Sequence, residues 1–336
     1  MQTSKKGLDL SPTAKFPAVS IILPVLNEET HLADCVVAIL SQDYPGNSEV
    51  ILALGPSTDK TDEVAQSLSR SDKRVRLVAN PTGRTAAGLN LAIAASNSPI
   101  IVRVDAHAEI PRNYISIAVA TLQETGAVNV GGVMAAQGKS LFEKAVALAM
   151  RSPLGVGASR FHTGGTAGPS DTVYLGVFLR EAIDEVGGFD ERFTRAQDWE
   201  LNHRLREAGG LIYFDPSLEV IYRPRSDFKA LAKQYFEYGR WRRVVTRRHE
   251  GTVNYRYLAP PFAVLASLFS IILGVVISPL LYIPVAIYLV FLIAASIRIG
   301  KSLVQVLILP FILLTMHMSW GVGFLTSPRT LVPNAE

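Results

Sequence analysis

Short apolar runs alternate with helical stretches over the first 110 residues of the chain. Four runs read as buried strands because β-branched and other apolar residues fill them: residues 19–24, 49–53, 76–79 and 100–104. Helical stretches follow the second and third runs, at 62–69 and 86–95. Strands that alternate with helices predict an α/β fold in which helices cover both faces of a mostly parallel sheet.

Polar residues gather directly after these predicted strands. Ligands bind beyond the carboxyl ends of the strands in open α/β sheets. The residues that fall there are Asn27, Glu28, Asp59, Arg84, Asp105 and His107. Arg84 has two equally weighted interpretations, a phosphate contact or a solvated loop cation.

The pattern becomes mixed between Val128 and Phe214. A glycine-rich stretch at 155–168 predicts a mobile loop, and residues 172–178 predict a strand. Helical patterns follow, one ending at Gly187-Gly188 and one over 198–208. Further α/β structure therefore continues up to the C-terminal third.

The last third of the chain is apolar and almost uncharged. No charged residue occurs between Arg256 and Arg298, or between Lys301 and Arg329. Three stretches, at 258–278, 280–297 and 302–325, approach the roughly 20 residues that a transmembrane helix needs. We therefore expect a disordered N-terminal segment at 1–16, a catalytic domain at 17–250 and a membrane region at 251–330. The first two stretches also fit a re-entrant hairpin or a buried soluble core.

Basic residues at 240–248 precede the first apolar stretch, and such juxtamembrane cations mark the cytoplasmic side. Residues 1–15 are polar and show no signal peptide. These features predict a multi-pass protein of the inner (plasma) membrane with a cytoplasmic catalytic domain and a C-terminal tail outside. The net charge of +4 is modest, and no nucleic-acid partner is expected. Cys35, the single cysteine, excludes an internal disulfide and a four-cysteine zinc site, and we expect it to be buried.

Two groups of residues are candidates for chemistry. Asp105 and His107 follow a strand two residues apart, and a carboxylate with an imidazole suits Mn²⁺ or Mg²⁺ bridging a diphosphate. The plainer interpretation is that Asp105 caps a turn. Asp198 opens a predicted helix, where it serves either as an N-cap or as a general base for an attacking hydroxyl.

Five motifs in order resemble those of family 2 glycosyltransferases, which have the Rossmann-like GT-A fold. They are the strand and loop at 19–28, the Ser-Thr-Asp-Lys-Thr turn at 57–61, Asp-Ala-His at 105–107, Gly-Gly-Phe-Asp at 187–190 and Asp-Trp-Glu-Leu at 198–201. The resemblance runs from about residue 19 to residue 241. With the Tyr-Gly-Arg-Trp-Arg run at 238–242 and the apolar tail, it looks closest to bacterial exopolysaccharide enzymes of the succinoglycan-biosynthesis type.

The resemblance implies an inverting, metal-dependent transfer from a nucleotide-sugar donor to a lipid-linked (polyprenyl) saccharide acceptor. It assigns donor binding to Pro24, Asn27, Glu28, Asp59, Arg84 and Asp105. Asp105 and His107 would hold the divalent cation, and Asp198 would act as the base. Trp199, Arg240 and Trp241 would bind the acceptor. Membrane lipids and other polysaccharide-assembly enzymes are the remaining expected partners.

Three positions depart from the family pattern. Leu54 stands where the family usually has a base-recognising Asp, so the resemblance does not imply a preference for UDP and leaves the nucleotide open. His107 replaces an acidic metal ligand, which favours Mn²⁺, and Gln197 replaces the first acid of an acidic pair. Two other functions remain open: a polyprenyl-phosphate sugar synthase, and a catalytically inactive subunit of a membrane assembly.

Overall fold

The computed structural model describes residues 15–332, so most of the expected disordered N-terminal segment lies outside it. The chain divides into two compact units. The first holds the described residues up to Met134 together with Gly164–Ile221, and the second holds Ala135–Thr163 and the chain from Tyr222 onward. The second unit therefore begins well before the apolar region.

An eight-stranded sheet in the order β3-β2-β1-β4-β7-β5-β8-β6 organises the first unit. The strands are β1 (Val19–Val25), β2 (Ser48–Leu54), β3 (Val75–Ala79), β4 (Ile100–Arg103), β5 (Asn129–Ala136), β6 (Gly168–Pro169), β7 (Tyr174–Leu179) and β8 (Ile212–Tyr222). The four strands predicted from residues 19–104 are all present, within one or two residues at each end.

The sheet is parallel in one half and antiparallel beyond it. β1 pairs in parallel with β2 and with β4, and β2 pairs in parallel with β3. β7 runs antiparallel to both β4 and β5, and β6 runs antiparallel to β8. The expected parallel α/β half is confirmed, and the antiparallel pairs belong to the part of the chain where the sequence pattern is mixed.

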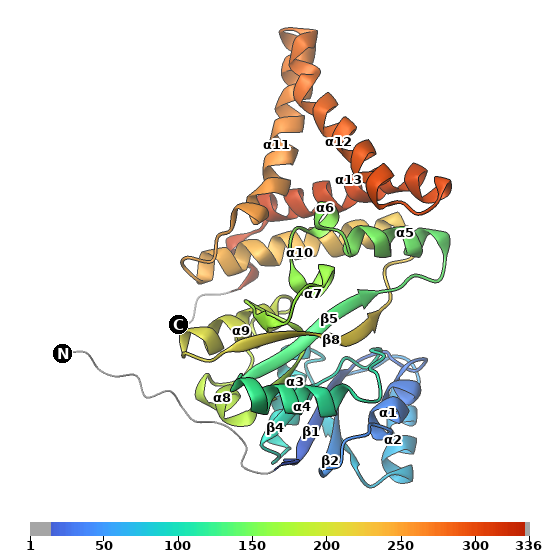
Figure 1. The fold of residues 1–336 in the computed structure, drawn as a ribbon, viewed down its shortest axis with the longest axis vertical. Coiled ribbons are helices and arrows are strands. Elements are labelled where there is room, and N and C mark those ends of the chain that lie inside the picture. The colour runs from blue at the N-terminus through green and yellow to red at the C-terminus, as the bar shows by residue number, and fades with distance from the viewer. Residues whose placement is uncertain (1–14, 333–336) are drawn as a thin grey trace, which may run out of the picture. The chain divides into compact units, whose positions relative to one another are not determined.

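Helices cover the sheet of the first unit (Figure 1). They are α1 (Leu32–Leu40), α2 (Thr61–Ser71), α3 (Thr85–Ala94), α4 (Tyr114–Thr125), α8 (Arg180–Glu185) and α9 (Gln197–Glu207). The core between sheet and helices consists of fully buried apolar side chains such as Ile22, Leu52 and Leu89. Cys35 on α1 is 5% exposed, as expected.

The second unit is helical. It contains α5 (Leu141–Met150), α6 (Pro153–Val156), α7 (Arg160–Thr163), α10 (Phe228–Arg248), α11 (Tyr255–Val276), the 3-10 helix η1 (Pro279–Tyr282), α12 (Ile283–Ile299), α13 (Leu303–Thr326) and the 3-10 helix η2 (Arg329–Leu331). The glycine-rich stretch at 155–168, expected to be a loop, includes the short helices α6 and α7. The helices α5 and α10 are additional to those that the sequence pattern predicts.

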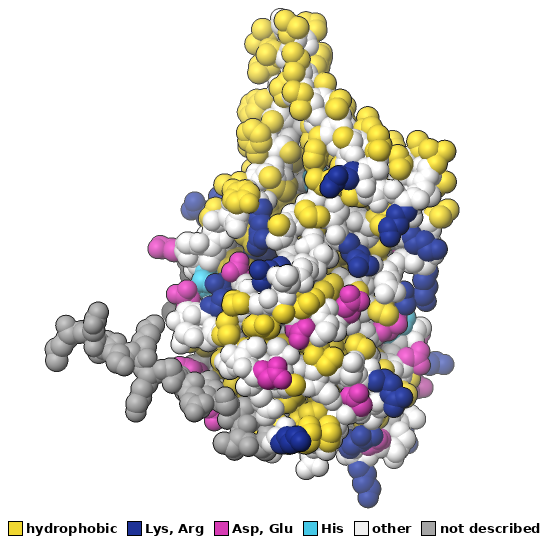
Figure 2. Space-filling model, in the orientation of Figure 1, with side chains coloured by type: hydrophobic (Ala, Val, Ile, Leu, Met, Phe, Trp, Pro, Cys, Tyr) yellow, Lys and Arg dark blue, Asp and Glu magenta, His cyan; other side chains and the backbone are white. Residues whose placement is uncertain are grey.

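Three helical segments are long and apolar enough to cross a membrane: Tyr255–Val276, Pro279–Ile299 and Leu303–Thr326. Hydrophobic side chains cover the projection that α11 and α12 form, and Lys and Arg side chains gather at its base (Figure 2). Water would not solvate such a surface well, so the chain is suited to membrane attachment.

Two glycines let α10 and α13 approach each other closely. A Cβ added at Gly239 of α10 would lie 2.0 Å from the carbonyl oxygen of Trp320, and one added at Gly323 of α13 would lie 2.1 Å from that of Phe236. Both distances are far shorter than any real contact, so neither position accepts a larger side chain without separating the helices. Gly239 belongs to the Tyr-Gly-Arg-Trp run, and this packing explains why a glycine stands there.

Gly239→Ala tests this packing. Alanine in place of glycine usually stabilises a helix by about 1 kcal/mol. Here the added methyl group meets the backbone of α13, and overpacking of this kind costs about 1–3 kcal/mol. We expect a lower unfolding temperature in detergent, while Lys233→Ala, at an exposed position of the same helix, should leave it nearly unchanged. A Gly239→Ala protein as stable as the wild type would contradict the close approach.

Candidate active site

A buried arginine joins the two carboxylates that sequence analysis selected separately. Arg103 is the last residue of β4 and is 4% exposed. Its Nη2 donates to Oδ1 of Asp105 at 2.9 Å, and its Nη1 forms an ion pair with Oδ1 of Asp198. A guanidinium stays charged at any accessible pH and is costly to bury without partners. The two carboxylates therefore lie on either side of one fixed cation.

Asp198 reaches this position from the first turn of α9. The helix begins after Ala196, which has a left-handed backbone (φ 59°), and no side chain caps it. The N-cap interpretation of Asp198 is therefore wrong. A non-glycine residue with positive φ is strained, and such strain is concentrated at functional sites. Asp105 likewise directs its carboxylate to Arg103.

His107 is oriented by Glu28. Its Nδ1 lies 2.7 Å from Oε1 of Glu28, and the imidazole is about half exposed. A proton on Nδ1 in this hydrogen bond leaves Nε2 as the ring nitrogen that carries the lone pair. Carboxylates commonly hold metal-binding histidines in this way.

The loop that carries Asn27 and Glu28 is tied to the turn after β2. The backbone N–H of Glu28 donates to the hydroxyl of Thr61 at 2.7 Å, and Oδ1 of Asn27 accepts from the N–H of Thr58 at 2.8 Å. Asn27 has positive φ (55°). Asp59 accepts from Thr61 and from the N–H of Glu29. The hydrogen bond from the Thr61 side chain, with further backbone N–H donors, holds the pKa of Asp59 below its usual range.

Asp59 thus binds protein donors through both of its oxygens, and its contact with a donor molecule stays a prediction. Pro24 lies half-buried within β1. Arg84 is exposed just before α3, and its backbone N–H donates a hydrogen bond to the hydroxyl of Thr82. Because Arg84 follows β3, it lies at the carboxyl edge of the sheet, which is compatible with either interpretation of it.

The segment 187–204 is held by groups that sequence analysis did not select. Arg204 pairs with Glu200 at 2.6 Å and also donates to the carbonyls of Val186 and Gly188. The side chain of Asn90 bonds both backbone groups of Phe189. These contacts fix the Gly-Gly-Phe-Asp turn to α9 and α3, and so fix the helix that presents Asp198.

Of the three residues predicted to bind the acceptor, Trp199 belongs to the first unit, and Arg240 and Trp241 belong to the second. Trp199 on α9 is 7% exposed, with its ring stacked on His203 at a centroid distance of 5.3 Å. Arg240 and Trp241 lie on α10 in the second unit. Arg240 pairs with Glu237 at 2.8 Å, and Trp241 is buried. Their part in acceptor binding stays a prediction.

The Asp105 carboxylate and the His107 imidazole could provide two ligands to a divalent cation. Such a cation would take most of its other ligands from the bound substrate. Among residues 15–332, no group of three or more His, Cys, Asp or Glu side chains is arranged to hold a metal ion. Arg103 binds Oδ1 of Asp105 and leaves Oδ2 to other ligands. A cation here would take its remaining ligands from diphosphate oxygens and water, as Mn²⁺ and Mg²⁺ readily do.

Cys35 is a buried neighbour of Asp105 and Glu28. Its thiol donates to the carbonyl of Asp105 at 3.6 Å. Burial raises the pKa of this thiol to about 12, and the negative charges of Asp105 and Glu28 add to the effect. One buried side chain therefore lies close to both the Arg103–Asp105 pair and the His107–Glu28 pair.

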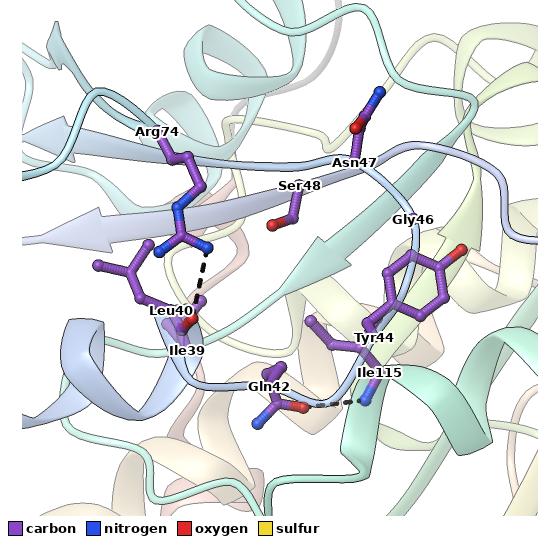
Figure 3. A pocket seen from close by; sticks show the side chains of 9 residues that line it. All are labelled: Ile39, Leu40, Gln42, Tyr44, Gly46, Asn47, Ser48, Arg74 and Ile115. Atoms are coloured by element: carbon purple, nitrogen blue, oxygen red, sulfur yellow. Dashed lines mark hydrogen bonds between the residues drawn. The ribbon is translucent and has the colours of Figure 1, made fainter.

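A pocket of about 410 Å³ lies at the opposite edge of the sheet (Figure 3). It includes Ser48, the first residue of β2, and so lies at the amino ends of the strands. Its Arg74 pairs with Asp72, and its Gln42 accepts from the N–H of Ile115. No residue selected for chemistry lines it, so we do not assign it to the active site.

A half-parallel sheet with polar loops at the carboxyl ends of its strands is the architecture of the GT-A fold of glycosyltransferases. The glycosyl transferase family 2 model matches residues 20–187. Succinoglycan biosynthesis protein ExoA of Rhizobium meliloti is 32% identical and covers 90% of this chain and 93% of its own. The chain belongs to glycosyltransferase family 2 and is a glycosyltransferase.

Two further proteins are similar over nearly the whole chain. A dolichyl N-acetyl-α-D-glucosaminyl phosphate 3-β-D-2,3-diacetamido-2,3-dideoxy-β-D-glucuronosyltransferase of Methanococcus voltae is 28% identical and covers 91% of this chain and 95% of its own. The mannosyltransferase PcManGT of Pyrobaculum calidifontis, solved with GDP-Man and Mn²⁺, has a TM-score of 0.60 at 20% identity, covering 94% of this chain and 88% of its own. The latter supports the GT-A fold.

Two substitutions of Arg103 should separate the role of its positive charge from the role of its two-nitrogen geometry in positioning Asp105 and Asp198. Arg103→Lys keeps the charge but cannot contact two carboxylates through two fixed nitrogens, so we expect transfer to fall at least tenfold with little change in unfolding temperature. Arg103→Met should also lower stability, by about 1–3 kcal/mol, because two partly buried carboxylates lose their partner.

Arg76→Met is the matched control. Arg76, about half exposed, forms an ion pair with Glu49 near the protein surface, and surface pairs contribute about 0–1 kcal/mol. Transfer rates and thermal unfolding in detergent measure all three variants. Wild-type transfer by Arg103→Lys would show that the bridge has no role in positioning.

Proposed function

We propose that the chain transfers one sugar, with inversion, from a nucleotide-sugar donor to a lipid-linked saccharide during polysaccharide or glycolipid synthesis. The observation that carries this proposal is the Arg103 bridge, because it brings the candidate metal ligand Asp105 next to the candidate base Asp198. A transfer by direct displacement needs a donor diphosphate and a deprotonating group at one place.

The donor would bind along the carboxyl edge of the parallel strands. Asn27 and Glu28 would contact the nucleoside, and Arg84 would contact the diphosphate. A divalent cation at Asp105 and His107 would supply positive charge against the diphosphate as it leaves. The complex of PcManGT with GDP-Man and Mn²⁺ supports both the donor class and the cation.

Asp198 would accept the proton of the acceptor hydroxyl. The hydroxyl oxygen attacks the anomeric carbon, the bond from that carbon to the diphosphate oxygen breaks, and the nucleoside diphosphate leaves with the bonding electrons. Asp198 is about one-third exposed, so an acceptor can approach it. Arg103 holds one carboxylate oxygen, which leaves the other to receive the proton.

A lipid-linked acceptor fits the apolar helices of the second unit. An enzyme anchored beside a bilayer meets acceptors that are confined to it at high local concentration. The Methanococcus voltae relative, which is named for transfer to a dolichyl-phosphate-linked sugar, supports this acceptor class. Trp199, Arg240 and Trp241 are the residues we assign to the acceptor.

A screen of nucleotide sugars against membranes that contain the protein tests this function. Label should pass from one donor into the lipid fraction, and added Mn²⁺ or Mg²⁺ should be required. Transfer to a lipid phosphate that carries no sugar would identify a polyprenyl-phosphate sugar synthase instead. Failure of every donor, with no hydrolysis by the purified protein, would contradict an active transferase.

Asp198→Asn should abolish transfer because the amide cannot accept the proton. Nucleotide-sugar binding, measured by calorimetry or by protection against thermal unfolding, should change only a few fold. Asp72→Asn is the control, since Asp72 pairs with Arg74, which lines the pocket at the opposite edge of the sheet. More than a few per cent of wild-type transfer by Asp198→Asn would remove Asp198 as the base.

Asp105→Ala should weaken metal and donor together. Binding of Mn²⁺ in the presence of the nucleotide sugar should no longer saturate at the concentrations that can be reached. The affinity for the nucleotide sugar should fall at least tenfold. An unchanged metal titration would place the cation elsewhere.

A further inference from the structure

We infer that α13, although it is long enough to span a bilayer, lies in the plane of the membrane between the bilayer and the helices α10, α5 and α6. Residues at its two ends then face the same side. This inference concerns membrane attachment and does not depend on the proposed reaction.

α10 cannot cross a bilayer, because charged side chains occur along its whole length. They are Lys229, Lys233, Glu237, Arg240, Arg242, Arg243, Arg247 and Arg248. A lysine or arginine in the hydrocarbon core is strongly unfavourable. Its buried residues include Leu231, Tyr235 and Gly239, at intervals of four, so it presents one apolar face. A helix of this kind lies at the membrane surface.

The C-terminal half of α13 follows α10 side by side. Gly323 packs against Phe236, and Trp320 packs against Gly239. The guanidinium of Arg243 lies over the ring of Phe324, 5.0 Å from its centroid, and Arg247 donates to the carbonyl of Ser327, the residue that follows α13. Contacts thus extend from the middle of α10 to its C-terminal end and reach the C-terminal end of α13, so the two helices lie side by side over these turns (Figure 1).

α5 and α6 of the same unit also pack against α13. α5 carries Glu143 and Lys144, which suit a water-facing helix. Nε2 of His317 lies 3.0 Å from the carbonyl oxygen of Leu154 in α6. α13 thus packs against three helices of its own unit, of which α10 and α5 carry charged residues that do not suit the hydrocarbon core.

The uncovered side of α13 is apolar. Leu303, Leu307 and Phe311 are exposed at intervals of four residues, and Val322 and Leu325 continue the exposure near the other end. A helix with protein on one side and an apolar strip on the other fits the boundary between a protein surface and lipid.

Direct contacts place the chain after α13 beside the basic end of α10. Arg247 donates to the carbonyl of Ser327 at 3.0 Å, and Arg248 donates to that of Val332 at 2.9 Å. Arg329 therefore lies with the basic cluster, on the side that juxtamembrane cations favour. The sequence pattern predicts that the C-terminal tail lies on the opposite side of the membrane from the basic cluster. These contacts place the tail beside that cluster, and so on the same side of the membrane.

The membrane-entering element is then the hairpin of α11, η1 and α12. It contains no charged residue between Arg256 and Arg298. α11 and α12 converge on η1, where Ser270 of α11 donates to the carbonyl of Leu281. A Cβ at Gly274 would lie 2.6 Å from the ring of Tyr282. The hairpin is thus closed at its tip and opens toward α13 (Figure 1).

Single-cysteine labelling of the full chain tests the inference. Lys301→Cys and Thr330→Cys place thiols at exposed positions before and after α13, and Lys73→Cys marks the catalytic unit. The wild type is the background control, because its single cysteine, Cys35, is buried. A membrane-impermeant maleimide is applied to sealed vesicles of one orientation, and labelling is divided by that in detergent-solubilised vesicles.

We expect the labelling ratios at 301, 330 and 73 to agree within about twofold in both vesicle orientations. Labelling at 301 and at 330 from opposite sides would overturn the inference. A second measurement does not depend on new cysteines: alkaline phosphatase fused after Glu336, which is active only when exported, should be inactive. An active fusion would show that α13 spans the bilayer.

Discussion

The buried guanidinium of Arg103 is the interaction on which the rest of the active site depends. It cannot lose its charge, it lies at the end of a central strand, and it contacts one oxygen of Asp105 and one of Asp198. Those carboxylates come from positions 93 residues apart in the chain. A buried cation that must be paired therefore holds together a group suited to a metal-bound diphosphate and a group suited to removing a proton.

The surrounding backbone is arranged to keep this geometry. Asn27 and Ala196, both with positive φ, stand at the start of the loop that carries Glu28 and directly before the helix that carries Asp198. Such conformations persist only where neighbouring contacts impose them. Thr61 imposes the first through Glu28, and Arg204 and Asn90 stabilise the segment around the second. Local strain and long-range hydrogen bonds thus act together at the carboxyl edge of the sheet.

The second unit contains the three long apolar helices, which suit attachment to a membrane. Glycines at 239 and 323 bring α10 and α13 into backbone contact, so an amphipathic helix and an apolar helix form one layer. The α11–α12 hairpin stands on that layer. In this arrangement the apolar length of a helix does not decide whether it spans the bilayer, because the neighbour along which it packs sets its direction.

The sequence by itself determined the parallel half of the sheet, the burial of Cys35, the family, and the membrane character of the last third. Those features follow from local patterns: apolar runs of strand length, motifs within a few residues, and long uncharged stretches. It also offered an unused signal in Arg103, a charged residue within an apolar strand. Only the tertiary structure decided that Asp105 and Asp198 share that arginine, and that α13 runs along α10. Both depend on contacts between residues far apart in the chain, which no local pattern encodes.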